Sequence, residues 1–505
     1  MNCKVSSIRQ RLRRPETGGR LGGGNDLFRD VTLARALPFL RRSVWIATTL
    51  LLAVLLAGGA VSQAVPTRAS IIKTAAALPY FNFLTWELEA VGRMIFAGRL
   101  PPQGMPEPEA QVDMVRAYLE RTQRIGQLEE ELRRLVAAEA GSSAGGQDSA
   151  TTEQKSGHPL TWPPRNATAS TGFEIREEIE NVRVELAALR RQQGADRPLV
   201  EAVLKRQVGE ELRKAGLGVR GLVWPPVQFA FIEPPLKLTV SPRERISTVH
   251  SRVLKAAYDP VTLGESERAI QARTDLSAHI SRIGGMAVFP AMVVESSSLS
   301  WVLSTIAHEW VHHYLFLFPL GLRYASNDQV TTLNETVSEI VGVEIGERVA
   351  LRYYPEAVSP SAETTEGLAE KACACNVEEL WSQEYEMEQQ RWERYDRPMQ
   401  FDFQQAMRET RLHVDTLLAA GLVETAEAYM EARRRYFVEK GYPLRVLNQA
   451  YFAFNGNYAT GAASSSSIGP QLQQLRAESE DLAHFLEQVR WFTSLADLEK
   501  ALGAD

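Results

Sequence analysis

One apolar segment near the start of this chain limits its fold more than any other feature. The stretch SVWIATTLLLAVLLAGGAVSQAVPT, residues 43–67, carries no charged side chain. A helix of this length crosses the ~30 Å hydrocarbon layer of a bilayer at a rise of about 1.5 Å per residue. A buried helix of a soluble protein is the alternative, but the preceding basic residues stop where the apolar run begins, which favours membrane insertion. We therefore predict a transmembrane helix over residues 43–65.

The residues before this segment form a basic tail. Residues 1–42 contain ten lysines and arginines against three acids. Because cytoplasmic flanks carry the excess of positive charge, residues 1–42 are expected in the cytoplasm and the chain after about Pro66 outside it. Ser62 and Ala64 would suit a signal peptidase, yet the tail is long for a signal peptide. We expect a retained, single-pass anchor in the cell membrane with the remaining domain on the extracytoplasmic side.

Composition excludes some functions and leaves others open. The chain is 44% hydrophobic, which is enough for a large core, and its net charge of −6 gives no basic field of the kind that nucleic-acid binding requires. Cys373 and Cys375 are separated by one residue, so a disulfide between them would be strained. A zinc site there would lack its second half, and a loop or helix end is the simpler interpretation.

Two amphipathic segments predict a helical hairpin. Ile125, Leu128, Leu132 and Leu135 recur at helical spacing in the first segment. In the second, the apolar positions are Ile175, Ile179, Val182, Leu186 and Leu189. Each seam covers only two to three heptads, which suits a spacer or a helix that binds a protein partner better than a free coiled coil. The intervening residues 141–171 are rich in Ser, Gly and Thr and predict a flexible loop, and a third helix is expected from Pro198 to Ala215.

The second half of the chain predicts a small sheet followed by helices. LVWPPVQFAFIEPPLKLTVSPRERI alternates apolar residues between proline pairs and predicts two short strands. Gly284–Leu299 is a further strand candidate, and nearly everything after it has helical periodicity. The fold class is therefore α+β and predominantly α. The expected parts are the tail (1–42), the membrane helix (43–65), a helical arm (66–216) and a domain over 217–505.

The chemistry concentrates in STIAHEWVHHYLFLFPLG, residues 304–321, which holds three histidines. Residues four apart on a helix differ by only about 40° in direction, so His308 and His312 share a face and can bind one metal ion. His313 lies about 100° further round. Glu309 follows the first ligand, where a carboxylate reaches a metal-bound water, and this is the HExxH pattern. Apolar residues surround the helix, so both imidazoles would be costly to bury without a partner such as zinc.

A second helical segment offers a third ligand. In TTLNETVSEIVGVEIGERVALRYY, Glu335 and Glu339 lie 23 and 27 residues after His312 and share a helix face. We predict Glu335 as the ligand and Glu339 as an acceptor for the outer N–H of a ligating histidine. The alternative is a solvated acidic face, since Glu344 and Glu347 follow.

The segments HEWVH and NETVSE resemble the gluzincin metallopeptidases of the thermolysin and aminopeptidase-N kind. The resemblance covers about Gly284 to Ala350, and LNQAYFAFNGNYAT is more weakly similar to bacterial predicted aminopeptidases. The spacing is a few residues longer than in thermolysin, and Glu339 stands where aspartate is usual. The resemblance implies a zincin-like domain over 217–505, a zinc ion on His308, His312 and Glu335, and a cleft-lining strand in GGMAVFPAMVVES.

The mechanism implied by this resemblance uses zinc to activate a water and polarise a carbonyl, with Glu309 as the general base. An oxyanion donor is also needed, for which Tyr458 is the first candidate and His313 the second. We expect a membrane-anchored zinc peptidase that acts on a peptide or protein, and exopeptidase activity of the aminopeptidase type is one form of it. The alternatives are a non-catalytic zincin-like envelope or interaction protein, and a zinc hydrolase of a non-peptide amide or ester.

Overall fold

The computed structural model of this chain describes residues 66–83, 85–87, 89, 106–144, 167–219, 222–255, 258–358 and 401–503. Within these ranges, no helix combines the length and the apolar character that crossing a membrane requires. The basic tail, the apolar run predicted to span the membrane and all three cysteines lie outside the described residues.

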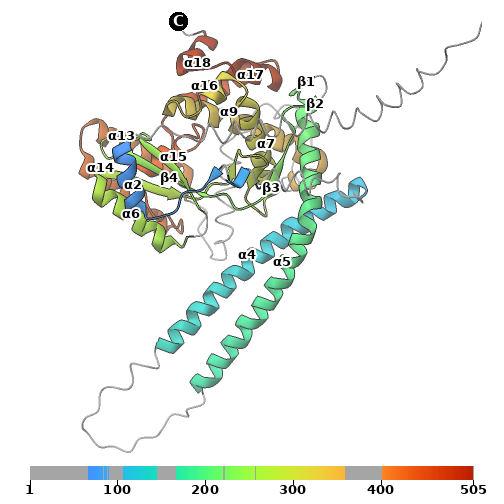
Figure 1. Cartoon of the computed structure of the whole chain (residues 1–505), viewed down its shortest axis with the longest axis vertical. Helices are drawn as coiled ribbons and strands as arrows, with labels where there is room; N and C mark the ends of the chain where they lie inside the picture. The colour runs from blue at the N-terminus through green and yellow to red at the C-terminus, as the bar shows by residue number, and fades with distance from the viewer. Residues whose placement is uncertain are drawn as a thin grey trace, which may run out of the picture. The chain divides into compact units, whose positions relative to one another are not determined.

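Helices form most of the described chain (Figure 1). They are α2 (Pro66–Ala76), α4 (Pro108–Ala144), α5 (Ala167–Lys214), α6 (Pro260–Thr274), α7 (Leu299–Leu315), α8 (Pro319–Leu322), α9 (Asp328–Tyr353), α10 (Pro355–Val358), α13 (Phe403–Ala419), α14 (Val423–Glu439), α15 (Gln449–Asn455), α16 (Ile468–Glu478), α17 (Leu482–Val489) and α18 (Leu495–Ala501). The strands are β1 (Gly218–Val219), β2 (Leu222–Val223), β3 (Phe229–Phe231), β4 (Leu236–Pro242), β5 (His250–Leu254), β6 (Leu276–Ser281), β7 (Gly285–Met286) and β8 (Ala291–Val293). The predominantly helical class with a minor β component is as predicted.

The strands belong to two small sheets and a two-stranded ribbon rather than to the single sheet expected. In one sheet the order is β5–β4–β6, and both pairings are antiparallel. In the other the order is β3–β8–β7, with β8 parallel to β3 and antiparallel to β7. The segment predicted as one strand from Gly284 is therefore a hairpin, in which Gly285 pairs with Val293 and Met286 with Met292. Periodicity could not show this reversal, because the apolar run continues through the turn.

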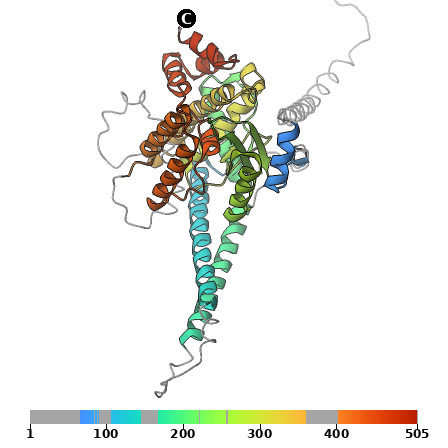
Figure 2. The same ribbon diagram turned by 90° about the vertical axis from the view of Figure 1, so that its left-hand side faces the viewer.

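The helices α4 and α5 pack together as an antiparallel pair (Figures 1 and 2). Their seam is the predicted one, with Leu128, Val182 and Leu186 buried between them. Arg121 pairs with Asp196 at 2.9 Å near one end of the seam, and Arg176 with Glu139 at 2.7 Å near the other. Helix α4 ends at Ala144 and α5 begins at Ala167, and the part of the predicted loop between them, residues 145–166, lies outside the described residues.

The third helix, expected to begin at Pro198, was a wrong prediction. Helix α5 continues through Pro198 without a break and ends at Lys214. Proline disfavours a helix interior because it removes one backbone hydrogen bond, but packing on both sides can retain it. Val200, Val203 and Leu204, just beyond the proline, are fully buried in the main core.

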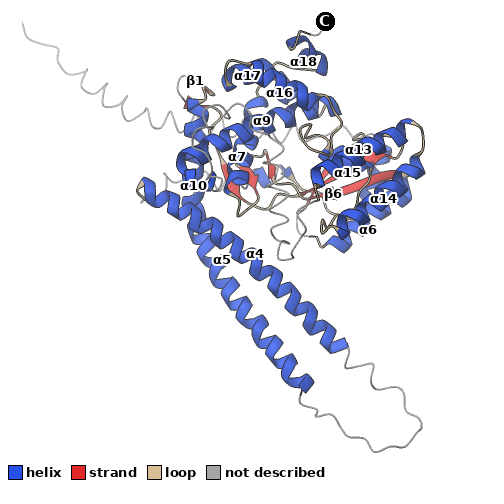
Figure 3. Cartoon of the chain, turned by 180° about the vertical axis from the view of Figure 1, so that it is seen from behind, coloured by secondary structure: helices blue, strands red, loops and turns tan. Residues whose placement is uncertain are grey.

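The centre of the main core is the pair α7 and α9 (Figure 3). Two glycines let these helices approach closely. A Cβ at Gly342 would lie 2.9 Å from the Ser304 carbonyl oxygen and 3.0 Å from the His308 Cβ. A Cβ at Gly346 would lie 2.8 Å from the Ser304 backbone nitrogen. Since real Cβ atoms do not approach backbone so closely, side chains at these positions would push the helices apart.

We predict that Gly346→Ala lowers the free energy of unfolding by about 1–3 kcal/mol, because overpacking strains a dense core. Helix propensity alone would act in the opposite direction by about 1 kcal/mol. The matched control is Gly264→Ala in α6, where an added Cβ meets nothing within 4 Å. Thermal unfolding should give a lower Tm for the first variant and an equal or higher Tm for the control. Equal Tm values for both variants would contradict the close-packing argument.

Candidate metal centre

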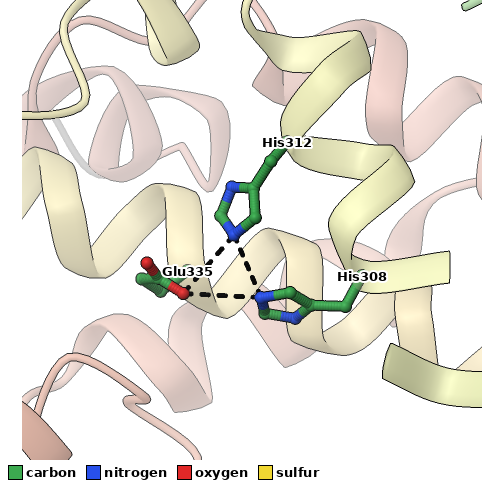
Figure 4. A group of neighbouring side chains, drawn as sticks. All are labelled: His308, His312 and Glu335. Atoms are coloured by element: carbon green, nitrogen blue, oxygen red, sulfur yellow. Dashed lines mark hydrogen bonds and ion pairs between the residues drawn. The ribbon is translucent and has the colours of Figure 1, made fainter. Parts of the chain in front are cut away.

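Three potential metal ligands converge at the contact between α7 and α9. Figure 4 shows the imidazoles of His308 and His312 and the carboxylate of Glu335 pointing toward one another. The two Nε2 atoms lie 3.0 Å apart, and each is 3.5 Å from Glu335 Oε2. Among the described residues this is the one group of three such side chains close enough to hold a metal ion. The three residues that the sequence predicts as ligands therefore lie close together in the structure.

The spacing of these atoms suits zinc. Bonds of about 2.0–2.1 Å at tetrahedral angles place ligand atoms roughly 3.3–3.4 Å from one another. The three observed separations, 3.0, 3.5 and 3.5 Å, lie around that value. Two imidazoles and a carboxylate are also a common donor set of catalytic zinc sites, which keep a fourth position open. The residues fit the metal.

The outer nitrogen of His312 is held by Asn334, a residue that the sequence analysis did not select. Nδ1 of His312 lies 2.8 Å from Asn334 Oδ1, and the Asn334 amide nitrogen donates to the Leu320 carbonyl at 3.3 Å. This pairing fixes the amide orientation and places a proton on Nδ1, so that in the neutral imidazole Nε2 would be the nitrogen that binds a metal. The position of Asn334 directly before the ligand glutamate was the sequence signal available for it.

Tyr324 is a second residue that the sequence analysis missed. Its hydroxyl donates a short hydrogen bond to Glu335 Oε1, and its ring lies edge-on to His312 with centroids 5.9 Å apart. Tyr324 lies in the connection between α8 and α9. Its contact leaves Oε2 as the oxygen that faces the histidines.

The electrostatics favour an ionised Glu335. Burial alone would raise the pKa of this carboxyl, but the charge of His312 and hydrogen bonds from both histidines hold it well below its ordinary value. Burial lowers the pKa of His308, whereas the pKa of His312 is raised because Glu335 outweighs its burial. The opposite shifts of His312 and Glu335 reflect the attraction between these two side chains.

Glu309 is the second carboxylate at the centre. It is 4% exposed and lines a cavity together with His308. Burial, with a smaller contribution from Glu335, raises its pKa to about 8, and His312 opposes the shift. Gly285 of β7 allows this arrangement, because a Cβ there would lie 2.1 Å from Glu309 Oε1. An edge strand therefore passes directly against the carboxylate.

Tyr458 reaches the cavity from a loop after α15. Its ring centroid lies 6.3 Å from that of His308. Two contacts join the loop to α9: Ala459 N donates to Thr336 Oγ1 at 3.1 Å, and the Thr460 hydroxyl donates to Glu339. Tyr458 therefore lines the cavity beside His308, and its role as an oxyanion donor stays a prediction. Glu339, predicted to hold a histidine, lines the cavity with His308.

His313, the second candidate for oxyanion donor, lies outside the cluster. Its Nε2 is 2.8 Å from the Val288 carbonyl, and its ring packs on Phe289 at 5.5 Å. This interaction holds the turn between β7 and β8. Glu87 holds the same turn, since its Oε1 accepts from Phe289 N at 3.1 Å. Both side chains position the edge strand, and neither contacts the ligands.

The cavity measures about 310 Å³, near the lower end of the range for small-ligand sites. It runs from His308 along the N-terminal half of α7 and is bounded by β7, α9, α13, α15 and the loop carrying Tyr458. A substrate in it would meet His308, Glu309 and Tyr458 at one end.

We predict that Glu335→Gln weakens zinc binding by at least about 100-fold, because the neutral amide removes both a charge and a ligand oxygen. Glu347→Gln on the same helix is the control, since Glu347 lies outside the ligand group. Competition with a zinc chelator measures both affinities. Equal affinities for the two variants would exclude Glu335 as a ligand.

We also predict a pH-dependent contribution from Glu87. Burial raises the pKa of this carboxyl to about 7, above the ordinary 4.5, so the folded state prefers the protonated form. Its contribution to the free energy of unfolding is therefore full below pH 4.5 and falls, by on the order of 3 kcal/mol, as the pH rises to 7. Glu87→Gln should remove this loss, so the Tm difference between variant and wild type should grow in favour of the variant from pH 4.5 to 7. A Tm difference that stays constant over this pH range would contradict the predicted contribution of Glu87.

No family model, curated protein or solved structure matches this chain. The assignment of the site thus rests on the positions of His308, His312 and Glu335 and on the cavity that reaches them.

Proposed function

We propose that this protein is a membrane-anchored zinc peptidase of the gluzincin kind, acting outside the cytoplasmic membrane. One observation carries the proposal: three donors at zinc spacing lie beside a buried carboxylate, and His308 and Glu309 line the same cavity. A purely structural zinc site has four protein ligands and no use for a neighbouring base. The set here offers three potential ligands, and the carboxylate of Glu309 lies outside it.

A bound zinc ion would lower the pKa of a water molecule and polarise a substrate carbonyl. Glu309 would accept the proton from that water and deliver it to the leaving amine, since its carboxylate faces the cavity without belonging to the ligand set. Tyr458 would donate a hydrogen bond to the oxygen on which negative charge develops. Asn334 and Tyr324 keep His312 and Glu335 oriented through both steps.

The edge strand favours a peptide as the substrate. Strand β7 lies at the edge of its sheet, and Gly284 and Gly285 line the cavity beside Glu309. An extended peptide can add to such an edge through backbone hydrogen bonds, which recognise any peptide irrespective of its side chains. A non-peptide amide or ester would not use this edge.

The test uses the full-length chain. We expect the purified chain to contain about one zinc ion and to hydrolyse peptides in a mixed library. Mass spectrometry identifies the products. Glu309→Gln should retain the zinc and lower kcat by about 10²–10⁴-fold, because the general base is lost and the ligands are not. A zinc-loaded wild type that cleaves no peptide would exclude the peptidase and favour a non-catalytic protein or a different hydrolase.

A further inference from the structure

The cavity differs chemically between its two ends. Few charged residues line it: Glu309 and Glu339 lie near the candidate ligands, and Arg282 follows β6. The Arg282 side chain is 68% exposed and pairs with Glu233 at 3.3 Å, so it belongs to the solvent side of the cavity. No other charged residue lines the cavity within the described part of the chain.

The wall away from the cluster is apolar and aromatic. Trp301 lies nearly two turns before His308 on α7, and Val343 lies one turn after Glu339 on α9. Both line the cavity. The opposite side is formed by helices that supply no predicted ligand: α13 contributes Phe403 and Met407, and α15 contributes Tyr451 and Phe454. The wall thus combines two helices of the metal centre with two distant ones.

Packing behind the wall fixes its shape. Phe403 stacks on Tyr442 with ring centroids 4.3 Å apart, and Met407 is 1% exposed within the same core. The floor consists of the small residues Gly461, Ala462 and Ala463, and Arg411 holds it by donating to the Ala463 carbonyl at 2.9 Å. Small residues and large aromatic ones therefore line the same cavity, and contacts behind both hold them in place.

A charged substrate side chain in this space would lose its hydration and gain no partner, which is costly. A large apolar side chain would gain about 25 cal/mol for each Å² that it buries. A small side chain would leave much of the wall unfilled. Size and polarity therefore select the same class of substrate residue.

We infer that the cavity is a specificity pocket for a large apolar or aromatic side chain of the peptide, next to the bond that is cleaved. Trp301, Val343, Phe403, Met407 and Phe454 determine this preference. The inference rests on the proposed function for the cleavage of the bond, and on the cavity alone for the recognition of the side chain.

The test measures binding separately from hydrolysis. The full-length Glu309→Gln protein is titrated calorimetrically with an alanine-based peptide and with the same peptide carrying one phenylalanine or one lysine at each position in turn. We expect phenylalanine at one position to bind at least about tenfold more tightly than alanine, and lysine there to bind no better than alanine. Phenylalanine binding that equals alanine binding at every position would overturn the pocket.

Filling the cavity should reverse this preference. In Val343→Phe the added ring enters existing space, so the ratio of phenylalanine to alanine affinity should fall about tenfold. Ala462→Leu fills the floor and should act in the same direction. The control is Leu351→Phe, also on α9, where the native side chain is 58% exposed. An unchanged ratio in both filled variants would contradict the inference.

Hydrolysis separates the inference from the proposed function. If the wild type binds phenylalanine peptides selectively but cleaves none of them, the result supports the specificity pocket and contradicts the peptidase activity. If it cleaves peptides without side-chain preference, the result supports the peptidase activity and contradicts the specificity pocket.

Discussion

The close contact between α7 and α9 is the constraint on which the rest of the structure depends. Gly342 and Gly346 remove the side chains that would separate the two helices, and Ser304 and His308 occupy the space. Glu335 lies two turns before Gly342 on α9, so its carboxylate reaches the imidazoles of α7 only while this contact persists. A shift of about 1 Å between the helices would move the donor atoms out of the range that a zinc ion spans. Core packing and ligand geometry are therefore one requirement and not two.

The buried polar groups of the candidate centre contact one another, and these contacts offset part of the free-energy cost of burying them. Burying a histidine or a carboxylate without a partner is expensive, and six such groups lie in residues 308–313 of α7 and 335–339 of α9. Asn334 satisfies the outer nitrogen of His312, and Tyr324 satisfies one oxygen of Glu335. What remains is the set of atoms that face one another across 3.0–3.5 Å. A divalent cation would satisfy all of them at once.

The sequence predicted what depends on local periodicity and missed what depends on distant packing. The shared face of His308 and His312 followed from the 3.6-residue repeat, and so did the shared face of Glu335 and Glu339 on a second helix. The continuation of α5 through Pro198 and the hairpin after Gly284 were missed, because core contacts and strand pairing decide them. Tyr324 was missed because a turn sequence does not show where its side chain points. The wall formed by α13 and α15 begins at Phe403, 68 residues after Glu335 (403 − 335), which is farther than the local motifs extend.

The arrangement of charge along the cavity links recognition to chemistry. The charges that would take part in hydrolysis, those of the ligands and Glu309, lie at one end, and the apolar wall lies at the other. An apolar side chain that fills the far end expels water from the path between them. Interactions at the charged end would then act in a lower dielectric, where the proposed hydrogen bond from Tyr458 would be stronger than in water. Edge strand β7 would fix the peptide backbone while the wall fixes one side chain, and together these two contacts would hold the carbonyl in one position. Selectivity at the far end would therefore raise the rate at the near end, because the same filled cavity that identifies the substrate also excludes the solvent.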